Sequence, residues 1–296
     1  MAAQFRPGDQ VRAARADPPY HTRLPRYARG AIGTVVEQQG CYPLPDRRAR
    51  QLPAGPEPVY TVRFAAAELF GEGDHTVTID LWESYLQPGG TAVSGEHTGA
   101  AAALAARVRH LERLLEQRGL VDPQEPDRAL EAFLARASPA NGARLAARAW
   151  ADEGLRARLL ADANATRPEL GLSMDGGLQE QRLKVVPNTE DSHNIIVCTF
   201  CSCYPIALLG PSPTWYKSEA YRSRIVRDPR AVLREFGFML GPQVKINVWD
   251  SSAESRYMVL PRRPAGTEGL NEQALAALVT RDSMIGTGLP RAPGSR

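Results

Sequence analysis

Three of the four cysteines of the chain stand within six consecutive positions, and these residues are the best suited to chemistry. Cys198, Cys201 and Cys203 follow the apolar stretch NIIV in the segment VCTFCSCYP. Thiolates bind soft and borderline metal ions, and the spacing C-x-x-C-x-C lets three of them converge on one ion. The segment therefore predicts a metal site around which its own backbone wraps.

The sequence leaves several kinds of centre open. A structural zinc site would need a fourth ligand, and His193, five residues before the first cysteine, is more typical of a histidine with hydrogen-bond partners. An iron–sulfur cluster would need a fourth thiolate, and the remaining Cys41 lies in a different predicted domain. Three crowded thiols without metal would be prone to oxidation. We favour three thiolates completed by deprotonated amide nitrogens of Ser202 and Cys203, which requires a strongly polarising ion such as trivalent cobalt or iron.

Composition and charge describe an ordinary folded chain. With 296 residues, 43% of them hydrophobic and 23% charged, two folded units with two cores are expected, and a disordered or fibrous protein is excluded. A formal net charge of +3 does not point to nucleic acid as a partner. No run of 18 apolar residues and no secretory signal are recognisable, so we expect no membrane association and a reducing, cytoplasmic environment.

The elements that must position the cysteines predict an α+β protein. Short strands rich in β-branched residues at 31–38, 59–64 and 75–82 suggest a small barrel of about five strands over residues 1–88. In the last of these strands, Val77, Ile79 and Leu81 alternate with polar residues, which predicts a half-exposed antiparallel strand. A Gly-rich stretch at 89–100 is expected to be a flexible linker.

Residues 101–296 are predicted to form helices followed by a mixture of strands and helices. Apolar periodicity predicts a helical arm over 101–165, with helices near 104–119 and 141–163. A catalytic domain over 166–296 is then predicted, with strands near 182–187, 194–198, 244–250 and 256–261, and helices near 218–226, 229–237 and 271–280.

The cysteine segment resembles the metal-binding loop of the nitrile hydratase α subunit. The similarity extends in order from about residue 101 to 286, through LKVVPNTEDSHNIIVCTFCSCYP, PTWYKSEAYRSRIVRDPRAVLREFG and VWDSSAESRYMVLP. The first ninety residues resemble the C-terminal half of the β subunit, through FRPGDQVR, HTRLPRYARGAIGTV and VTIDLWESYLQP, and that half is an SH3-like barrel in the family. The chain is thus similar to a fusion of the two.

The resemblance implies the state of each metal ligand. By analogy with the family, Cys198 stays a thiolate, Cys201 becomes a sulfinate and Cys203 a sulfenate, while Ser202 contributes its amide nitrogen together with that of Cys203. Thr199 and Tyr204 match cobalt-type loops, so one Co(III) ion per chain is expected, with Fe(III) as the alternative.

Further site residues and a partner also follow from the resemblance. Arg23 matches a β-subunit arginine that binds the oxidised sulfurs, whereas Arg26 and Arg29 are expected to be structural. Gln179 stands where the α subunit places a pocket glutamine. A second arginine belongs to the N-terminal half of the β subunit, which these residues do not contain. We therefore expect a hetero-oligomer in which a separate subunit resembling that half supplies it.

One departure leaves the substrate open. Ile206 stands where nitrile hydratases usually have tryptophan, so the substrate pocket is expected to be altered. Trp215 and Tyr216 match the family and are expected to be packing residues. The implied activity is hydration of a nitrile to an amide by a hydro-lyase, in which the sequence does not choose the nucleophile. Hydrolysis of thiocyanate to carbonyl sulfide and ammonia, and a non-catalytic cobalt carrier, are the alternatives.

Overall fold

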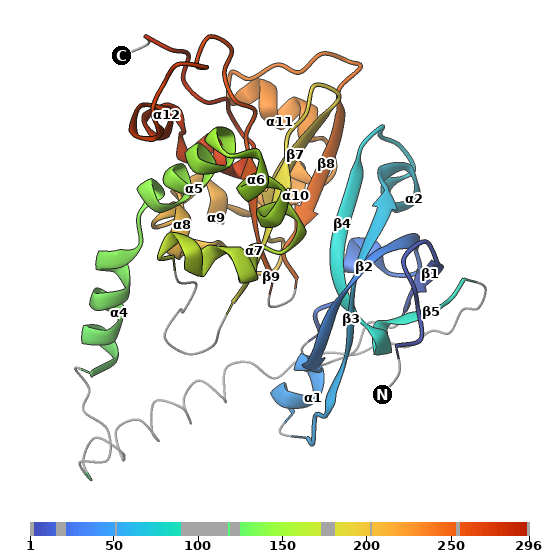
Figure 1. The fold of residues 1–296 in the computed structure, drawn as a ribbon. Helices are drawn as coiled ribbons and strands as arrows, with labels where there is room; N and C mark the ends of the chain where they lie inside the picture. The colour runs from blue at the N-terminus through green and yellow to red at the C-terminus, as the bar shows by residue number, and fades with distance from the viewer. Residues whose placement is uncertain are drawn as a thin grey trace.

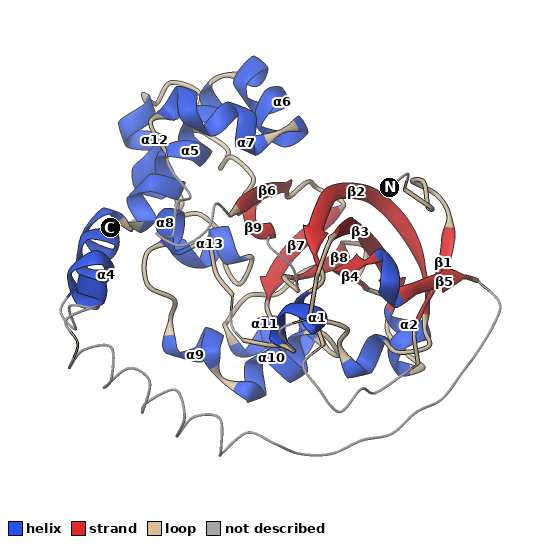
Figure 2. Cartoon of the chain, turned by 90° about the horizontal axis from the view of Figure 1, so that it is seen from below, coloured by secondary structure: helices blue, strands red, loops and turns tan. Residues whose placement is uncertain are grey.

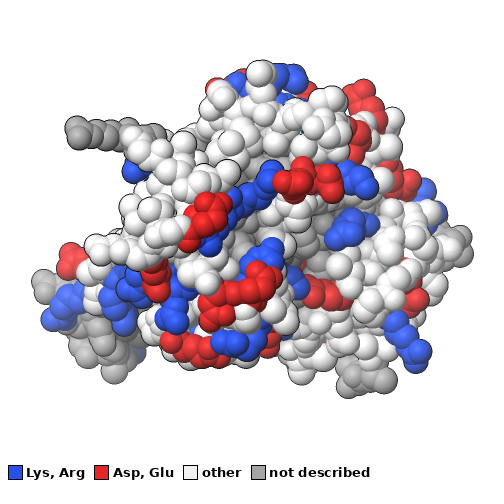
Figure 3. Space-filling view, turned by 45° about the horizontal axis from the view of Figure 1, so that its top comes forward, with Lys and Arg blue, Asp and Glu red and all other residues white. Residues whose placement is uncertain are grey.

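The N-terminal part of the chain is built from strands and the C-terminal part from helices around a few strands (Figure 1). The computed structural model describes residues 3–15, 22–50, 52–89, 125–172, 181–201, 203–252 and 255–294, together with Arg118. The protein has a mixed α and β structure, as predicted. Positive and negative side chains are interspersed on the face shown in Figure 3, in keeping with the small net charge.

Five strands run antiparallel to one another in the N-terminal part. They are β1 (Gln10–Ala13), β2 (Ile32–Pro43), β3 (Pro56–Ala65), β4 (Thr76–Trp82) and β5 (Leu86–Pro88). The short helices α1 (Pro45–Ala49) and α2 (Ala66–Phe70) stand between them. Gly33 on β2 has no space for a side chain, because a Cβ atom there would lie 2.6 Å from Val62.

The C-terminal part contains two pairs of parallel strands and a series of short helices. The strands are β6 (Arg182–Pro187), β7 (Ser192–Val197), β8 (Lys245–Asp250) and β9 (Ser255–Leu260). The helices before them are α4 (Glu125–Arg136), α5 (Pro139–Ala151), α6 (Glu153–Ala161) and α7 (Ala163–Thr166). The other helices are α8 (Ile206–Leu209), α9 (Thr214–Lys217), α10 (Glu219–Ile225), α11 (Pro229–Glu235), α12 (Glu272–Leu278) and α13 (Arg281–Ile285).

Capping side chains explain where these helices begin. Asp152 accepts a hydrogen bond from the Leu155 amide and starts α6, so the single helix predicted over 141–163 is divided there. Ser218 and Asp228 start α10 and α11 in the same way. An oxygen at the N-cap satisfies an amide that the helix itself leaves without a partner, which favours a new helix at each such residue.

The two parts of the chain share one sheet. The order of the described strands is β5-β1-β2-β3-β4-β8-β7, and β4 pairs with β8 in parallel from Thr76↔Asn247 to Ile79↔Asp250. Figure 2 shows β8 and β7 extending the sheet beyond β4. A closed SH3-like barrel is not seen among the described residues, because β4 uses its free edge to pair with the C-terminal part.

The prediction that β4 is half-exposed is wrong. Thr78 and Asp80 on its polar side are fully buried, as are Val77, Ile79 and Leu81. The physical reason is tertiary: β4 has neighbours on both edges, and Tyr257 of β9 covers its polar side. Sequence alternation indicates which side chains share a face but not whether another layer covers that face.

A buried polar network joins the two parts at this point. The Asp80 carboxylate accepts hydrogen bonds from the Tyr257 hydroxyl at 2.8 Å and from the Thr61 hydroxyl at 2.8 Å. Gln39 donates to the Thr61 hydroxyl at 2.6 Å, and Ser255 donates to the Gln39 side-chain oxygen at 3.2 Å. Burial raises the pKa of Asp80 to about 6, although the bonds from Thr61 and Tyr257 act against it.

We expect Asp80 to make stability depend on pH. Its pKa is higher in the folded state than its ordinary value of 3.8. The folded state therefore binds the proton more tightly, and the resulting stabilisation is complete below about pH 4 and is lost as the pH rises through about 6. A shift of this size corresponds to about 3 kcal/mol. Urea unfolding of the protein and of Asp80→Asn should show the difference in unfolding free energy falling by this amount between about pH 4 and about pH 7. A constant difference would contradict the raised pKa.

The hydrophobic core is continuous across the two parts, although two cores were expected. One cluster of buried residues includes Val62, Phe64 and Ile79 from the N-terminal part together with Ile195 and Val248 from the C-terminal part. The expected linker at 89–100 and helix near 104–119 lie outside the described residues, apart from Gly89 and Arg118. In the part of the chain that is described, no helix is long and apolar enough to cross a membrane.

Candidate metal centre

The metal loop, residues 198–203, begins where β7 ends. The sulfur atoms of its three cysteines lie within 4.8 Å of one another, with 3.7 Å between Cys198 and Cys201 and 2.9 Å between Cys201 and Cys203. Cys198 is buried, Cys203 is partly buried and Cys201 is exposed. The structure thus brings the three predicted thiol ligands together in a geometry that one ion can share.

A buried carboxylate anchors the start of the loop. Asp250, the last residue of β8, accepts hydrogen bonds from the Thr199 amide at 2.9 Å and from the Thr199 hydroxyl at 2.6 Å. Tyr27 of the N-terminal part donates its hydroxyl to the same carboxylate at 2.5 Å. Burial raises the pKa of Asp250 to about 6, and the charge of Cys198 adds to this, while the bonds from Thr199 and Tyr27 lower it.

Two other side chains hold the carbonyl groups of the loop. Arg222 of α10 donates to the Thr199 oxygen at 2.9 Å and to the Phe200 oxygen at 3.2 Å. Tyr216 donates its hydroxyl to the Cys203 oxygen at 3.0 Å. The backbone on both sides of Cys201 is therefore fixed by groups from other elements.

The three thiols influence one another strongly. Hydrogen bonds with Cys198 and Cys203 lower the pKa of the Cys201 thiol to about 2, and the positive charge of Arg23 lowers it further. The same hydrogen bonds raise the pKa of Cys203. Both shifts have one cause, which is hydrogen bonding between the closely spaced sulfur atoms. A multivalent cation can stabilise all three thiolates together.

Positive charge reaches the loop from both parts of the chain. The pKa of Cys201 responds to the charge of Arg23, and the pKa of Cys203 is lowered by the charge of Arg256 on β9. The Arg23 Nε atom is buried and has no hydrogen-bond partner among the described residues. Its backbone amide is held by the Tyr85 hydroxyl at 3.1 Å. An unsatisfied buried donor of this kind is suited to an oxygen atom that the unmodified cysteines do not carry.

Two predicted site residues lie outside the described part of the chain. They are Ser202, which precedes Cys203 in the sequence, and Gln179. Arg29 donates to the Leu24 oxygen at 3.4 Å, which agrees with a structural role. Arg26 lines a groove described below.

His193 and Cys41, which the sequence offered as further metal ligands, do not join the three loop cysteines. His193 is buried, with Nε2 at 2.7 Å from the Gly286 oxygen and Nδ1 at 3.1 Å from the Asn188 side-chain nitrogen, so it is a histidine with both nitrogens in use. Cys41 is exposed on β2. Among the described residues, only the three loop cysteines form a group of three or more potential metal ligands.

The aromatic residues after the loop form a packed cluster. Trp215 contacts Tyr216, Tyr221 and Phe236 edge to face, at ring distances of 4.7 to 6.0 Å, which confirms a packing role for it. Ile206 starts α8 and is partly buried against the core. Tyr216 does more than pack, since it also binds the Cys203 carbonyl.

A groove of about 960 Å³ runs between the two parts beside the loop. Pro25, Tyr27 and Phe70 line it from the N-terminal part, and Thr199, Phe200 and Arg222 line it from the C-terminal part. It is large enough for a small organic molecule or a peptide segment. The Thr199–Phe200 side of the metal loop is therefore accessible from solvent through this groove.

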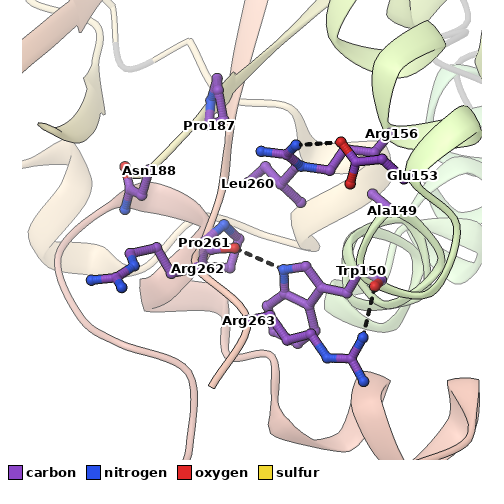
Figure 4. Close-up of a pocket in the computed structure, with 10 residues that line it drawn as sticks. All are labelled: Ala149, Trp150, Glu153, Arg156, Pro187, Asn188, Leu260, Pro261, Arg262 and Arg263. Atoms are coloured by element: carbon purple, nitrogen blue, oxygen red, sulfur yellow. Dashed lines mark hydrogen bonds and ion pairs between the residues drawn. The ribbon is translucent and has the colours of Figure 1, made fainter. Parts of the chain in front are cut away.

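Another cavity, of about 260 Å³, contains no residue of the metal loop. It lies at the carboxyl ends of β6 and β9, and Figure 4 shows several of its lining residues bound to one another. Trp150 donates to the Pro261 oxygen at 2.8 Å, Arg263 donates to the Trp150 oxygen at 2.9 Å, and Arg156 pairs with Glu153. The two bonds of Trp150 join α5 to the segment after β9, whereas the Arg156–Glu153 pair lies within α6.

Some of these residues were not found by sequence reasoning. Asp250 and Arg222 follow the first cysteine by 52 and 24 positions, and Tyr27 belongs to the other part of the chain. The one available signal was an acidic residue at the end of the apolar strand VKINVWD, because a carboxylate in such a place needs partners.

The sequence model described as "Nitrile hydratase, alpha chain" matches residues 102–288, and the one described as "Nitrile hydratase beta subunit, C-terminal" matches residues 1–88. The chain is 49% identical to the low-molecular weight cobalt-containing nitrile hydratase subunit alpha of Rhodococcus rhodochrous over 64% of this chain and 90% of that one. It is 41% identical to the thiocyanate hydrolase subunit gamma of Thiobacillus thioparus over 53% of this chain and 67% of that one. The cobalt-containing nitrile hydratase subunit beta of Pseudonocardia thermophila is 47% identical, and only 37% of its length is covered.

A solved structure agrees with these matches. A double mutant of the Fe-type nitrile hydratase from Comamonas testosteroni superposes with a TM-score of 0.57 at 40% identity, covering 67% of this chain and 95% of that one. Fold and cysteine loop together define a metal-binding chain of the α type. The protein belongs to the nitrile hydratase family, as an α chain preceded by the C-terminal part of a β subunit.

Proposed function

We propose that the protein is the metal-binding chain of a cobalt-dependent enzyme that hydrates a nitrile to the corresponding amide. The observation that carries this proposal is the convergence of three cysteine sulfurs within 4.8 Å, in a chain of the nitrile hydratase family. The donor set suits a transition-metal ion, because three thiolate ligands come from one short loop. The buried Arg23 nitrogen without a partner suits oxygen atoms on oxidised cysteines. Hydration in a reducing, cytoplasmic compartment is part of the proposal.

The ligands are Cys198, Cys201 and Cys203, with the amide nitrogens of Ser202 and Cys203. When bound, the trivalent ion would supply Lewis acidity that activates the C≡N group or a water molecule. We assign a sulfinate to Cys201 and a sulfenate to Cys203. Arg23 would donate to these sulfur-bound oxygens, because planar guanidinium groups bind anionic oxygen pairs well. Gln179 would orient the substrate.

Cobalt rather than iron is proposed for two reasons. Thr199 and Tyr204 match the cobalt-type loops of the family, and the relatives from Rhodococcus rhodochrous and Pseudonocardia thermophila are named as cobalt-containing. One ion per chain is proposed. The Fe-type structural relative makes Fe(III) the alternative ion.

A separate subunit is proposed to complete the site. This chain covers about two fifths of the β-subunit relatives and nine tenths of an α-subunit relative. The rest of a β subunit, including an arginine for the second oxidised sulfur, would come from a partner that resembles the N-terminal half. A hetero-oligomer is therefore part of the proposal.

Thiocyanate hydrolysis is the second candidate, and two observations favour it. The chain resembles a thiocyanate hydrolase gamma subunit, and Ile206 departs from the tryptophan usual in nitrile hydratases. The third candidate, a cobalt carrier, would bind the ion tightly without turnover. The product distinguishes the three candidates: an amide indicates nitrile hydration, carbonyl sulfide indicates thiocyanate hydrolysis, and the carrier forms no product.

The test is to purify the chain together with the subunit that copurifies with it. Elemental analysis, turnover of acetonitrile, benzonitrile and thiocyanate, and the intact mass of the loop peptide would be measured. We expect about one cobalt per chain, amide as the product, two added oxygens on Cys201 and one on Cys203. Zinc or an iron–sulfide cluster at the loop, or a loaded complex that releases only carbonyl sulfide, would contradict the proposal.

A further inference from the structure

The Arg222 guanidinium group is bound to backbone oxygens of the metal loop instead of to an acidic side chain. Its Nη1 atom lies 2.9 Å from the Thr199 oxygen and 3.2 Å from the Phe200 oxygen. Within the described residues, no carboxylate pairs with it, and its Nε atom is buried without a partner. A guanidinium group without an acidic partner is costly to bury. The position of Arg222 against the loop is therefore not explained by a role as a solvated surface charge.

The two bonds of Arg222 act on the turn between the first two cysteines. Thr199 and Phe200 are the residues that separate Cys198 from Cys201, and the Cys201 amide already points at the Cys198 sulfur, 3.4 Å away. Asp250 holds the amide and hydroxyl of Thr199, while Arg222 holds its carbonyl. The turn is thus held by an acidic group at one end and a basic group at the other.

We propose that Arg222 is a positioning residue of the metal centre, which holds the Cys198–Cys201 turn in its ligand-binding conformation. The inference rests on the proposed function and deepens it. Arg222 touches neither sulfur in the described contacts, so it acts through the loop backbone. A loop already ordered by the fold loses less conformational entropy when the ion binds. Residues that orient metal ligands typically contribute ten- to hundredfold to metal affinity or activity.

The chain offers a matched control on the same helix. Arg224 also belongs to α10, but its side chain is half exposed and pairs with Glu235 at the surface. Arg224→Gln removes the same charge from the same helix without touching the loop. Arg222→Lys keeps a positive charge but replaces the planar fork by a single flexible donor, so it separates charge from geometry.

The experiment compares the cobalt-loaded complexes of the wild type, Arg222→Gln, Arg222→Lys and Arg224→Gln. We would measure the release of cobalt to a chelator and the sulfur-to-cobalt absorption band. The mass of the loop peptide would report oxygen atoms added to its cysteines, and thermal unfolding would be followed for the metal-free chain. We expect Arg222→Gln to release cobalt about ten- to a hundredfold faster, with an altered absorption band. Arg222→Lys should lie between it and the wild type, and Arg224→Gln should match the wild type.

Two outcomes would overturn the inference. One is an Arg222→Gln complex that holds cobalt and oxidises its cysteines like the wild type. The other is equal loss of cobalt in Arg222→Gln and Arg224→Gln, which would indicate a general effect of charge on α10. If Arg222→Gln does not fold, the comparison of Arg222→Lys with Arg224→Gln decides by the same criteria. A wild-type complex without cobalt would instead refute the proposed function, and is distinguished because it appears before any variant is made.

Discussion

Replacing Cys203 by serine should abolish turnover while leaving the rest of the chain folded. The Cys203 sulfur lies 2.9 Å from that of Cys201, and the three cysteine sulfurs lie within 4.8 Å of one another, so Cys203 is placed to bind the same ion as the other two. A serine hydroxyl is a harder donor that does not ionise near neutral pH, and it cannot carry a sulfenate oxygen. The loss should therefore exceed the ten- to hundredfold that removal of a supporting residue causes. Initial rates with acetonitrile, together with cobalt content, measure it.

Cys41→Ser is the matched control for this variant. Cys41 is the other cysteine of the chain and is exposed on β2, so its replacement should change neither cobalt content nor rate. Thermal unfolding of the metal-free Cys203→Ser chain should resemble that of the wild type, because the loop lies at the end of β7 and not within the sheet. Full activity of Cys203→Ser would remove this residue from the centre.

Coexpression of Arg23→Gln and Cys203→Ser chains should give no recovery of activity. The pairing of β4 with β8 and the bond from Tyr27 to Asp250 dock the N-terminal part on the metal loop of its own chain. If Arg23 serves that loop, every site in a mixed assembly lacks either the arginine or the cysteine. Two different affinity tags isolate the mixed assemblies, whose rate is compared with the sum of the two single variants.

Action of Arg23 on another copy of the chain would give a recovery of activity of a defined size. If the N-terminal part were exchanged between chains, a mixed pair of one chain of each kind would contain both residues at one of its two sites, which is about half of the sites. Recovery of that order would show that Arg23 acts on another copy and that the β4–β8 pairing is formed between chains. An Arg26→Gln chain mixed with Cys203→Ser supplies the control for expression of two variants.

The fused arrangement has a consequence for the metal centre. In this chain Tyr27 and Arg23 are separated by only four positions, and both act toward the loop: one on the Asp250 carboxylate and the other on the charge of Cys201. A single segment of the N-terminal part thus influences both the anchor and the ligands. Separating the two parts would remove the Tyr27–Asp250 bond and the charge of Arg23 together. It would also expose the hydrophobic core that the two parts share.

The sequence by itself determined the three candidate metal ligands, the mixed fold and the family. Three donors within six positions can reach one ion through a single turn of the backbone, which makes the group recognisable in the sequence. Helix starts at Asp152, Ser218 and Asp228 are also local, since each cap binds the amide three residues later. The strands of the C-terminal part were predicted to within one or two residues for the same reason.

Only the tertiary structure decided what supports the ligands and which faces are buried. Asp250 meets Thr199 because β7 and β8 pair in parallel with Val197 opposite Asp250, and no periodicity specifies a register between distant strands. Tyr27 and Arg222 reach the loop through the docking of the N-terminal part and of α10. Asp80 looked like an outward-facing residue of an alternating strand, yet it is buried because Tyr257 covers it. Local spacing therefore defines the ligand set, whereas the charges and hydrogen bonds that hold it come from contacts that form only when distant segments pack.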